Sequence, residues 1–158
     1  MKSIKRLALL VIMLMITLLV SGCGNKNIEG TLDDIMTKVY AGIPDEEKPM
    51  MLMNTEVNAE NIEYYLGSTD IEYKEALASE SGVGSIAHSV VLLRAEDNAD
   101  VNKIKEEIKE KVNPRKWICV GVEKEDLIIK NKGNLIVLIM VEDQNTRTKI
   151  ETNFDNLK

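Results

Sequence analysis

The reactive side chains of the sequence are few: one histidine, His88, and two cysteines, Cys23 and Cys119. A nucleophilic catalytic site needs a serine or cysteine, a base and an orienting acid that converge in space. Ser89 directly follows His88, but neighbouring side chains of a strand point to opposite faces, so His88 does not simply activate Ser89. We therefore predict a structural or surface role for His88 and assign no catalytic residue.

A loop of small residues separates Glu80 from His88. Its segment 82–87, Gly-Val-Gly-Ser-Ile-Ala, matches the loose dinucleotide-binding pattern. That pattern holds a pyrophosphate only where it opens a helix, whereas this segment leads into an apolar run that predicts a strand. We predict no bound cofactor. Glu80 and His88, at the two ends of the loop, are the residues that we expect to contact a small ligand.

Metal binding and carboxylate chemistry have weak support in the sequence. Met50, Met51 and Met53 supply thioether sulfur, which suits monovalent copper, but methionine also fills gaps in ordinary cores. No pair of histidines or cysteines has the spacing of zinc ligands. Carboxylates such as Glu56 and Glu60 serve hydrolysis only as a pair at a defined separation, which a sequence does not give. We predict no metal and a solvated acidic face.

Cys23 has the most specific chemistry in the chain because of the residues that precede it. The first six residues include three basic ones, residues 7–20 are apolar except for Thr17, and Val-Ser-Gly leads into Cys23. This anatomy is typical of a secretory signal, and a cysteine at the cleavage point is where a diacylglycerol is attached. We predict a signal peptide over residues 1–22, lipidation of Cys23 and a polar tether over residues 23–30.

Two other interpretations of this N-terminal segment stay open, an uncleaved membrane anchor and an ordinary secretory signal. A membrane-spanning helix needs about 20 apolar residues, more than residues 7–20 supply. Lipidation places the protein on the extracytoplasmic face of the cell membrane. It also leaves Cys119 without a disulfide partner, and the apolar run around Cys119, residues 117–122, predicts a buried, inert thiol.

The charge of the chain argues against nucleic-acid binding. Without residues 1–22 the chain has 17 basic and 26 acidic side chains, a formal charge of −9. Proteins that bind nucleic acid usually carry a basic patch, because they must neutralise phosphates. No such patch is visible in the sequence, so we predict no nucleic-acid partner.

The apolar periodicity predicts helices alternating with short strands. The expected helices begin after Thr31, Asn58 and Asn98 and at Gln144, and the expected strands cover 50–57, 71–79, 87–95, 117–122, 127–131 and 135–141. The four apolar residues 90–93 are typical of a central strand covered on both faces. The order favours an α+β fold, a small antiparallel or mixed sheet covered by helices, in a single domain over residues 31–158.

Five runs of the sequence are informative in combination. They are Pro49-Met50-Met51-Leu52-Met53, Tyr64-Tyr65-Leu66-Gly67, Glu75-Ala76-Leu77-Ala78-Ser79-Glu80, Ile86-Ala87-His88-Ser89-Val90-Val91-Leu92-Leu93-Arg94 and Asn113-Pro114-Arg115-Lys116-Trp117-Ile118-Cys119-Val120-Gly121-Val122. Together they resemble a family of clostridial-type Gram-positive lipoproteins catalogued as domain of unknown function 4358. The resemblance covers nearly the whole mature domain. It implies a surface lipoprotein with a small α/β domain, and it carries over no catalytic residue.

These observations predict a lipid-anchored cell-surface lipoprotein that is a non-catalytic binding or accessory module of the Gram-positive cell envelope. Its expected partners are the membrane, through a diacylglyceryl group on Cys23, and an envelope protein or polysaccharide. The alternative is an envelope-modifying enzyme, or an accessory of a membrane acyltransferase that acts on surface polysaccharide. A deep pocket joining His88 to a carboxylate and a hydroxyl would favour the enzyme, whereas a shallow surface would favour binding.

Overall fold

Five strands pair into one sheet, and every pairing is antiparallel. The strands are β1 (Leu52–Glu56), β2 (Tyr73–Ser81), β3 (His88–Ala95), β4 (Ile128–Lys132) and β5 (Leu135–Val141), in the spatial order β1-β2-β3-β5-β4. The computed structural model describes residues 27–158. The predicted signal peptide and Cys23 lie outside the described residues.

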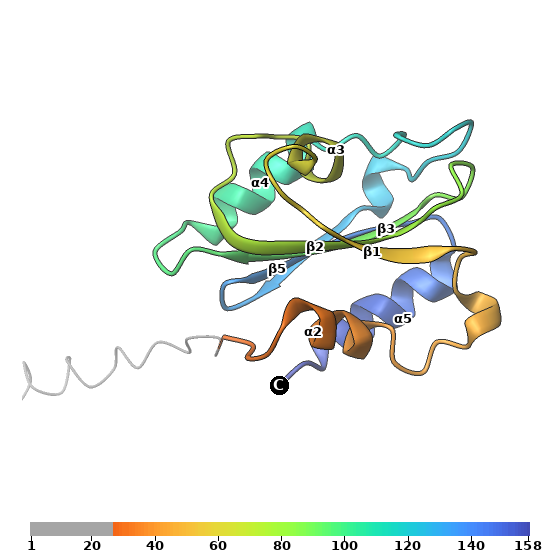
Figure 1. Cartoon of the computed structure of the whole chain (residues 1–158), viewed down its shortest axis with the longest axis horizontal. Coiled ribbons are helices and arrows are strands. Elements are labelled where there is room, and N and C mark those ends of the chain that lie inside the picture. The colour runs from red at the N-terminus through yellow and green to blue at the C-terminus, as the bar shows by residue number, and fades with distance from the viewer. Residues whose placement is uncertain (1–26) are drawn as a thin grey trace, which may run out of the picture.

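Within residues 27–158, four α-helices cover the sheet on both faces (Figure 1). They are α2 (Leu32–Val39), α3 (Ile62–Leu66), α4 (Val101–Lys111) and α5 (Gln144–Asp155). Helices α2 and α5 pack on one side, here called the α2 face, and α3 and α4 on the other, the α3 face. The predicted α+β class is confirmed. None of these four helices is long and apolar enough to cross a bilayer.

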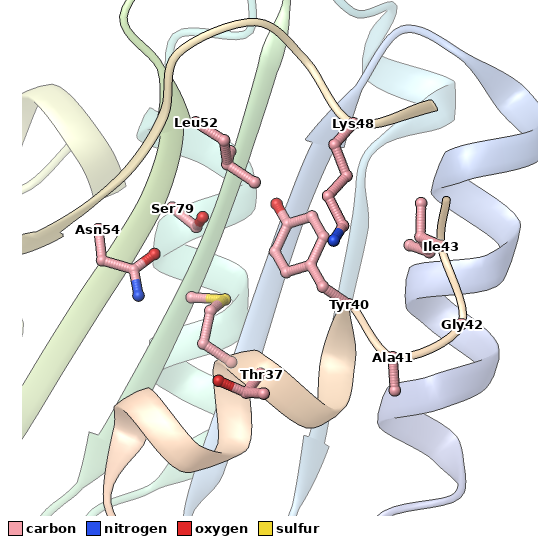
Figure 2. A pocket seen from close by; sticks show the side chains of 10 residues that line it. Thr37, Tyr40, Ala41, Gly42, Ile43, Lys48, Leu52, Asn54 and Ser79 are labelled. Carbon is pink, nitrogen blue, oxygen red and sulfur yellow. The ribbon is translucent and has the colours of Figure 1, made fainter. Parts of the chain in front are cut away.

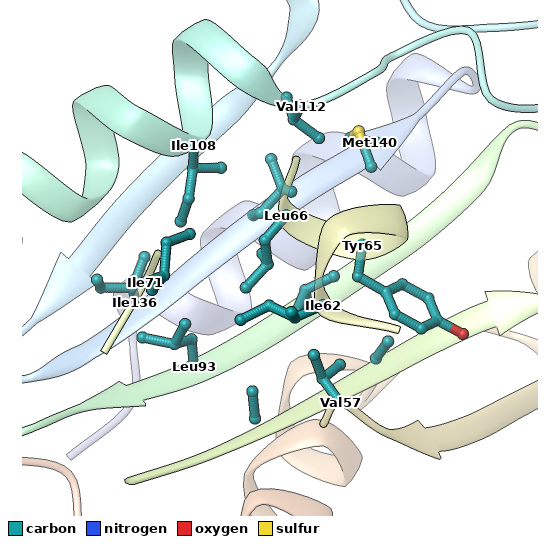
Figure 3. Packing of buried hydrophobic residues seen from close by; sticks show 14 of the residues in the cluster. Val57, Ile62, Tyr65, Leu66, Ile71, Leu93, Ile108, Val112, Ile136 and Met140 are labelled. Carbon is teal, nitrogen blue, oxygen red and sulfur yellow. The ribbon is translucent and has the colours of Figure 1, made fainter. Parts of the chain in front are cut away.

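Strands β3 and β5 form the centre of the sheet, and their side chains alternate between two cores. From β5, Val137 and Ile139 enter the core on the α2 face, while Ile136 and Met140 enter the core on the α3 face (Figure 3). All seven residues of β5 are buried. This double burial explains why β5 and residues 90–93 of β3 are continuously apolar and do not alternate with polar residues. The prediction of a central strand over residues 90–93 is confirmed.

Side-chain caps set the beginnings of the three longer helices. The Thr31 hydroxyl accepts a hydrogen bond from the Asp34 N–H (3.2 Å), as the sequence predicts. Helix α4 begins later than predicted, because Asp100 and not Asn98 is its cap and accepts from the N–H groups of Asn102 and Lys103. Both residue types cap helices well, so the choice between them depends on the tertiary path of the chain.

Residues 117–122 form a loop, so the prediction of a strand there is wrong. The Ile118 N–H donates to the Gly84 carbonyl (2.7 Å) of the loop between β2 and β3, and the Val122 N–H donates to the Pro114 carbonyl (2.9 Å), which turns the segment back toward its own start. Trp117 and Val122 enter the α3-face core, whereas Ile118 is exposed. An apolar run predicts burial, but it does not distinguish a strand from a loop that buries only some of its residues.

The folded domain begins before Thr31, the predicted boundary. Ile28 is buried in the α2-face core. The Arg94 guanidinium, near the end of β3, donates to the carbonyls of Ile28 (2.7 Å) and Gly30 (2.8 Å). Residues 27–30, assigned from sequence to the tether, therefore pack on the domain, which leaves only residues 24–26 between Cys23 and the fold.

Two glycines allow a matched test of packing around α3. Gly67 ends α3 at φ +81°, and a Cβ atom there would lie 2.3 Å from the Lys111 backbone of α4. Gly42 has a similar φ of +70° but nothing within 4 Å. We expect Gly42→Ala to cost about 1 kcal/mol of unfolding free energy through backbone strain alone, and Gly67→Ala to cost several-fold more. Urea denaturation of both variants measures the difference, and equal losses would contradict the close packing of α3 on α4.

Candidate functional site

A pocket of about 630 Å³ opens between α2, the loop 41–48 and β1 (Figure 2). We call it the α2–β1 pocket. Its lining consists of Met36, Thr37, Tyr40, Ala41, Gly42, Ile43, Lys48, Leu52, Asn54 and Ser79. The wall at residues 41–42 is held in place by α5, where the Asn153 amide donates to the carbonyls of Val39 and Ala41 (both 2.9 Å). Apolar side chains thus alternate with hydroxyl, amide and ammonium groups around one opening, which suits a ligand with mixed apolar and polar surface.

Tyr40, which lines the pocket, forms a hydrogen bond with His88, a buried ring outside the lining. The Tyr40 hydroxyl lies 2.7 Å from His88 Nε2, and the two rings stack with centroids 5.9 Å apart. Figure 2 shows the Tyr40 hydroxyl pointing toward Ser79. Burial lowers the pKa of His88 to about 4 and raises the pKa of Tyr40. Both groups are therefore uncharged at neutral pH, and Tyr40 is not activated as a nucleophile.

The polar groups at the rim are already oriented by neighbours. The Asn54 amide donates to the Asp33 carboxylate (3.2 Å), and the Lys48 ammonium donates to Asp45 (2.8 Å). The ten residues of the lining include no carboxylate. The pocket therefore has the groups needed to bind a ligand by hydrogen bonds and apolar contact, but its own lining does not supply a nucleophile, a base and an acid together.

A second polar cluster lies on the opposite face of the sheet. The Lys116 ammonium pairs with the Glu80 carboxylate (3.2 Å) and sits over the rings of Tyr64 (4.1 Å to the centroid) and Tyr65 (4.7 Å). Tyr64 also donates to Glu80 (3.1 Å). Only 3% of the Lys116 side chain and 10% of the Glu80 side chain are exposed. Burial lowers the pKa of Lys116 to about 8, although Glu80 acts in the opposite direction.

The structure does not bring the predicted ligand residues, Glu80 and His88, into one site. In the ladder Glu80 lies opposite Ser89, and both face α3, whereas His88 lies opposite Val141 and faces α2. An offset of one residue in a strand moves a side chain to the other face of the sheet. No local pattern pointed to Tyr40 or Lys116, because each reaches its cluster from an element distant in the chain.

Other candidate residues from the sequence occupy the surface. Cys119 is exposed and has a φ of +62°, so the prediction of a buried thiol is wrong. It sits in the 117–122 loop, which buries only some of its side chains. Met50, Met51 and Met53 are exposed as well. Within residues 27–158 no group of three or more His, Cys, Asp or Glu side chains is arranged to hold a metal ion.

Comparisons with family models, with curated proteins and with solved structures find no match to this chain. The resemblance of the five sequence runs to the lipoprotein family stays a prediction. A function for this chain is therefore inferred from its own residues, from the geometry of the α2–β1 pocket and from that of the Lys116–Glu80 cluster.

The buried His88 predicts a pH dependence of stability. Its folded pKa of about 4 lies below the ordinary value of 6.5, so the unfolded chain takes up the proton first as the pH falls. The contribution of the neutral His88 to the free energy of unfolding is complete above pH 6.5. It is lost as the pH falls from 6.5 to 4, by an amount on the order of 3 kcal/mol. We expect His88→Gln to unfold with a shallower pH dependence over that window. Parallel stability curves for the two proteins in urea denaturation would contradict the burial of a neutral histidine.

The Lys116–Glu80 pair predicts strong coupling between the two side chains. Lys116→Met leaves the Glu80 carboxylate buried without a cation, which we expect to cost about 3–5 kcal/mol. The double variant Lys116→Met/Glu80→Leu removes both charges and should recover most of that loss. A double-mutant cycle of unfolding free energies measures the coupling, and additive losses from the two single variants would show that the pair is not coupled.

Proposed function

We propose that this chain is a lipid-anchored lipoprotein whose α+β domain is a non-catalytic binding or accessory module of the Gram-positive cell envelope. The observation that carries the proposal is the arrangement of a basic start, an apolar run over residues 7–20 and Val-Ser-Gly before Cys23. A diacylglyceryl group supplies two acyl chains, which anchor stably where one chain would bind only marginally. The domain then lies on the extracytoplasmic face of the cell membrane.

The docking of residues 27–30 supports a close position at the bilayer. Ile28 is the first buried residue of the fold and stands five positions after Cys23. Five residues span at most about 18 Å when extended. The end of the sheet near Arg94 and Asn134, where Asn27 and Ile28 bind, would therefore face the membrane. The opposite end, at the loop between β2 and β3, would face away from it (Figure 1).

The α2–β1 pocket is the binding site that we assign to this module. Its lining combines the apolar Met36, Ile43 and Leu52 with the amide of Asn54 and the hydroxyl of Thr37. The uncharged Tyr40–His88 pair beneath it supports binding rather than nucleophilic chemistry, since neither ring carries charge at neutral pH. An envelope protein or polysaccharide is the class of partner that an anchored domain meets at this surface.

One observation favours a second candidate, an envelope-modifying enzyme or an accessory of a membrane acyltransferase. The 2.7 Å contact between Tyr40, which lines the pocket, and the buried His88 gives a proton a path between a lining hydroxyl and an imidazole. Turnover of an envelope polysaccharide by the purified protein that is lost in His88→Gln and in Tyr40→Phe would establish this alternative. Unchanged turnover in both variants would exclude a role of the pair in catalysis.

The anchor is tested by metabolic labelling with a fatty acid. We expect the full chain to take up label and to fractionate with membranes, because the thiol of Cys23 accepts the diacylglycerol. Cys23→Ala should abolish the label. Cys119→Ala, which changes the one cysteine of the described residues, is the matched control and should retain it. Label retained in Cys23→Ala would refute the anchor, whatever the ligand of the domain.

A further inference from the structure

The two edges of the sheet differ in how they are protected. Natural sheets guard exposed edges with lysines, charges or covering elements. At one edge, β4 carries two lysines: Lys130 binds the Asp155 carboxylate at the end of α5, and Lys132 donates to the carbonyl of Leu157 just beyond it. Lys105 of α4 also donates to Asn131 of β4. At the other edge, β1 has the sequence Leu-Met-Asn-Thr-Glu, without lysine or proline. The edge of β1 is therefore the open one.

Two backbone hydrogen bonds determine which groups of β1 face outward. The Val57 N–H donates to the Ala76 carbonyl and the Gly82 N–H donates to the Met51 carbonyl, both at 2.9 Å. The register between them is continuous, so the odd-numbered residues bond to β2 and the even-numbered ones point away from it. By this register the N–H and C=O groups of Leu52 and Asn54 are not bonded to β2, the one strand beside β1, and no bond from another segment of residues 27–158 reaches them. The edge thus offers two donors and two acceptors.

A strand added to this edge would meet a different surface on each face of the sheet. Side chains of a strand alternate between the faces, and cross-strand neighbours share a face. On the α2 face, an added residue beside Leu52 or Asn54 would project toward the α2–β1 pocket, which both residues line. On the α3 face, the next residue would meet Met53 and, near the start of β1, Met51, which are 52% and 63% exposed. Methionine side chains adapt to varied partners.

The charge around β1 selects a basic partner. Asp33 binds the Asn54 amide, and Glu56 ends the strand. Both line a second hollow, of about 480 Å³, farther along β1. Neither is in an ion pair among residues 27–158, whereas the lysine of that lining, Lys74, is already paired with Asp97 (2.6 Å). These residues as a whole contain 16 basic and 26 acidic side chains, a formal charge of −10. Pairing of β1 with β1 of a second copy would bring two such surfaces together, which their repulsion opposes.

We propose that the free edge of β1 and the α2–β1 pocket bind an extended, basic segment of a partner protein by strand addition. Backbone bonds to Leu52 and Asn54 hold the segment. An apolar side chain enters the pocket, and a lysine or arginine lies beside Asp33 and Glu56. This ligand class belongs to the binding site assigned to the module, so it rests on the proposed binding function but not on lipidation. A chain that fails the labelling experiment can still bind such a segment, and a lipidated chain can fail to bind it, so the two failures are distinguishable.

The test uses the full chain, purified in detergent from whichever cell fraction holds it, and two fluorescent synthetic peptides. Both peptides alternate leucine with threonine; one is flanked by lysines and the other by glutamates. We expect the basic peptide to bind at least about tenfold more tightly at low ionic strength. Amide hydrogen exchange should slow at Leu52 and Asn54 when it binds. Glu56→Lys should weaken the basic peptide and strengthen the acidic one.

Two variants of Asn54 separate backbone pairing from side-chain contact. Asn54→Pro removes the outward N–H, which an edge strand tolerates, and should weaken the basic peptide by about tenfold or more. Asn54→Ala keeps the N–H and removes only the amide that lines the pocket, so it should weaken the basic peptide less than Asn54→Pro does. If Asn54→Pro does not fold, Thr37→Trp tests the other half of the proposal: it fills the pocket mouth from an exposed position on α2 and should weaken the basic peptide, and unchanged binding would exclude the pocket as the site.

Four results would overturn the proposal. The first is equal binding of the basic peptide by Asn54→Pro and Asn54→Ala, and the second is protection only of amides that lie outside β1. The third is no binding of either peptide. The fourth is a concentration-dependent dimer of the chain that Asn54→Pro abolishes. The last result would identify a second copy as the occupant of the edge.

Discussion

The antiparallel pairing of β3 with β5, covered on both faces, is the constraint on which the rest of this structure depends. Val91 lies opposite Leu138 in the α3-face core, and Leu92 lies opposite Val137 in the α2-face core. Such a strand pair has no solvated side along which polar residues can alternate. Polar side chains are accommodated only at the two ends of β3: Arg94 at one end, and His88 and Ser89, which both have partners, at the other. The location of the chemistry in this domain is thus a consequence of how thoroughly its centre is buried.

Two polar clusters lie on opposite faces of the sheet where β3 begins. One is held by a hydrogen bond between neutral groups and the other by an ion pair. On the α2 face, the Tyr40–His88 bond joins the end of α2 to β3 with two neutral groups, and Tyr40 also lines the α2–β1 pocket. On the α3 face, Lys116 ties the 113–122 loop to β2 and α3 through an ion pair and two aromatic rings. Buried charges require well-placed partners far more than buried neutral groups do. Loss of one partner is therefore expected to cost more in the Lys116–Glu80 cluster than in the Tyr40–His88 pair.

Most of the fold could be predicted from the sequence, because periodicity and caps are local signals. Thr31 and the apolar runs 90–93 and 135–141 determine their elements without reference to the rest of the chain. The errors arise where tertiary structure decides. The run 117–122 is a loop that buries only some of its side chains, which leaves Cys119 outside.

The candidate site was harder to predict than the fold. Glu80 and His88 stand at the ends of one loop, but the pleat sends them to opposite faces. Tyr40 and Lys116 come from an unrelated helix and loop, so no spacing in the sequence links them to their partners. Sequence patterns report the burial of single elements, whereas a site between elements depends on register and on the direction in which each side chain leaves the backbone.

The bonds from Arg94 to the carbonyls of Ile28 and Gly30 have a mechanical consequence. They fasten the start of the fold to the last residues of β3, at one end of the sheet, while Leu52 begins β1 at the other end. A pull between an anchor at Cys23 and a segment held at Leu52 would run along the strands and load their ladder bonds in shear. Bonds loaded in shear must yield together, whereas peeling breaks them one at a time. An anchored domain of this form is a stiff coupling that transmits force with little slack.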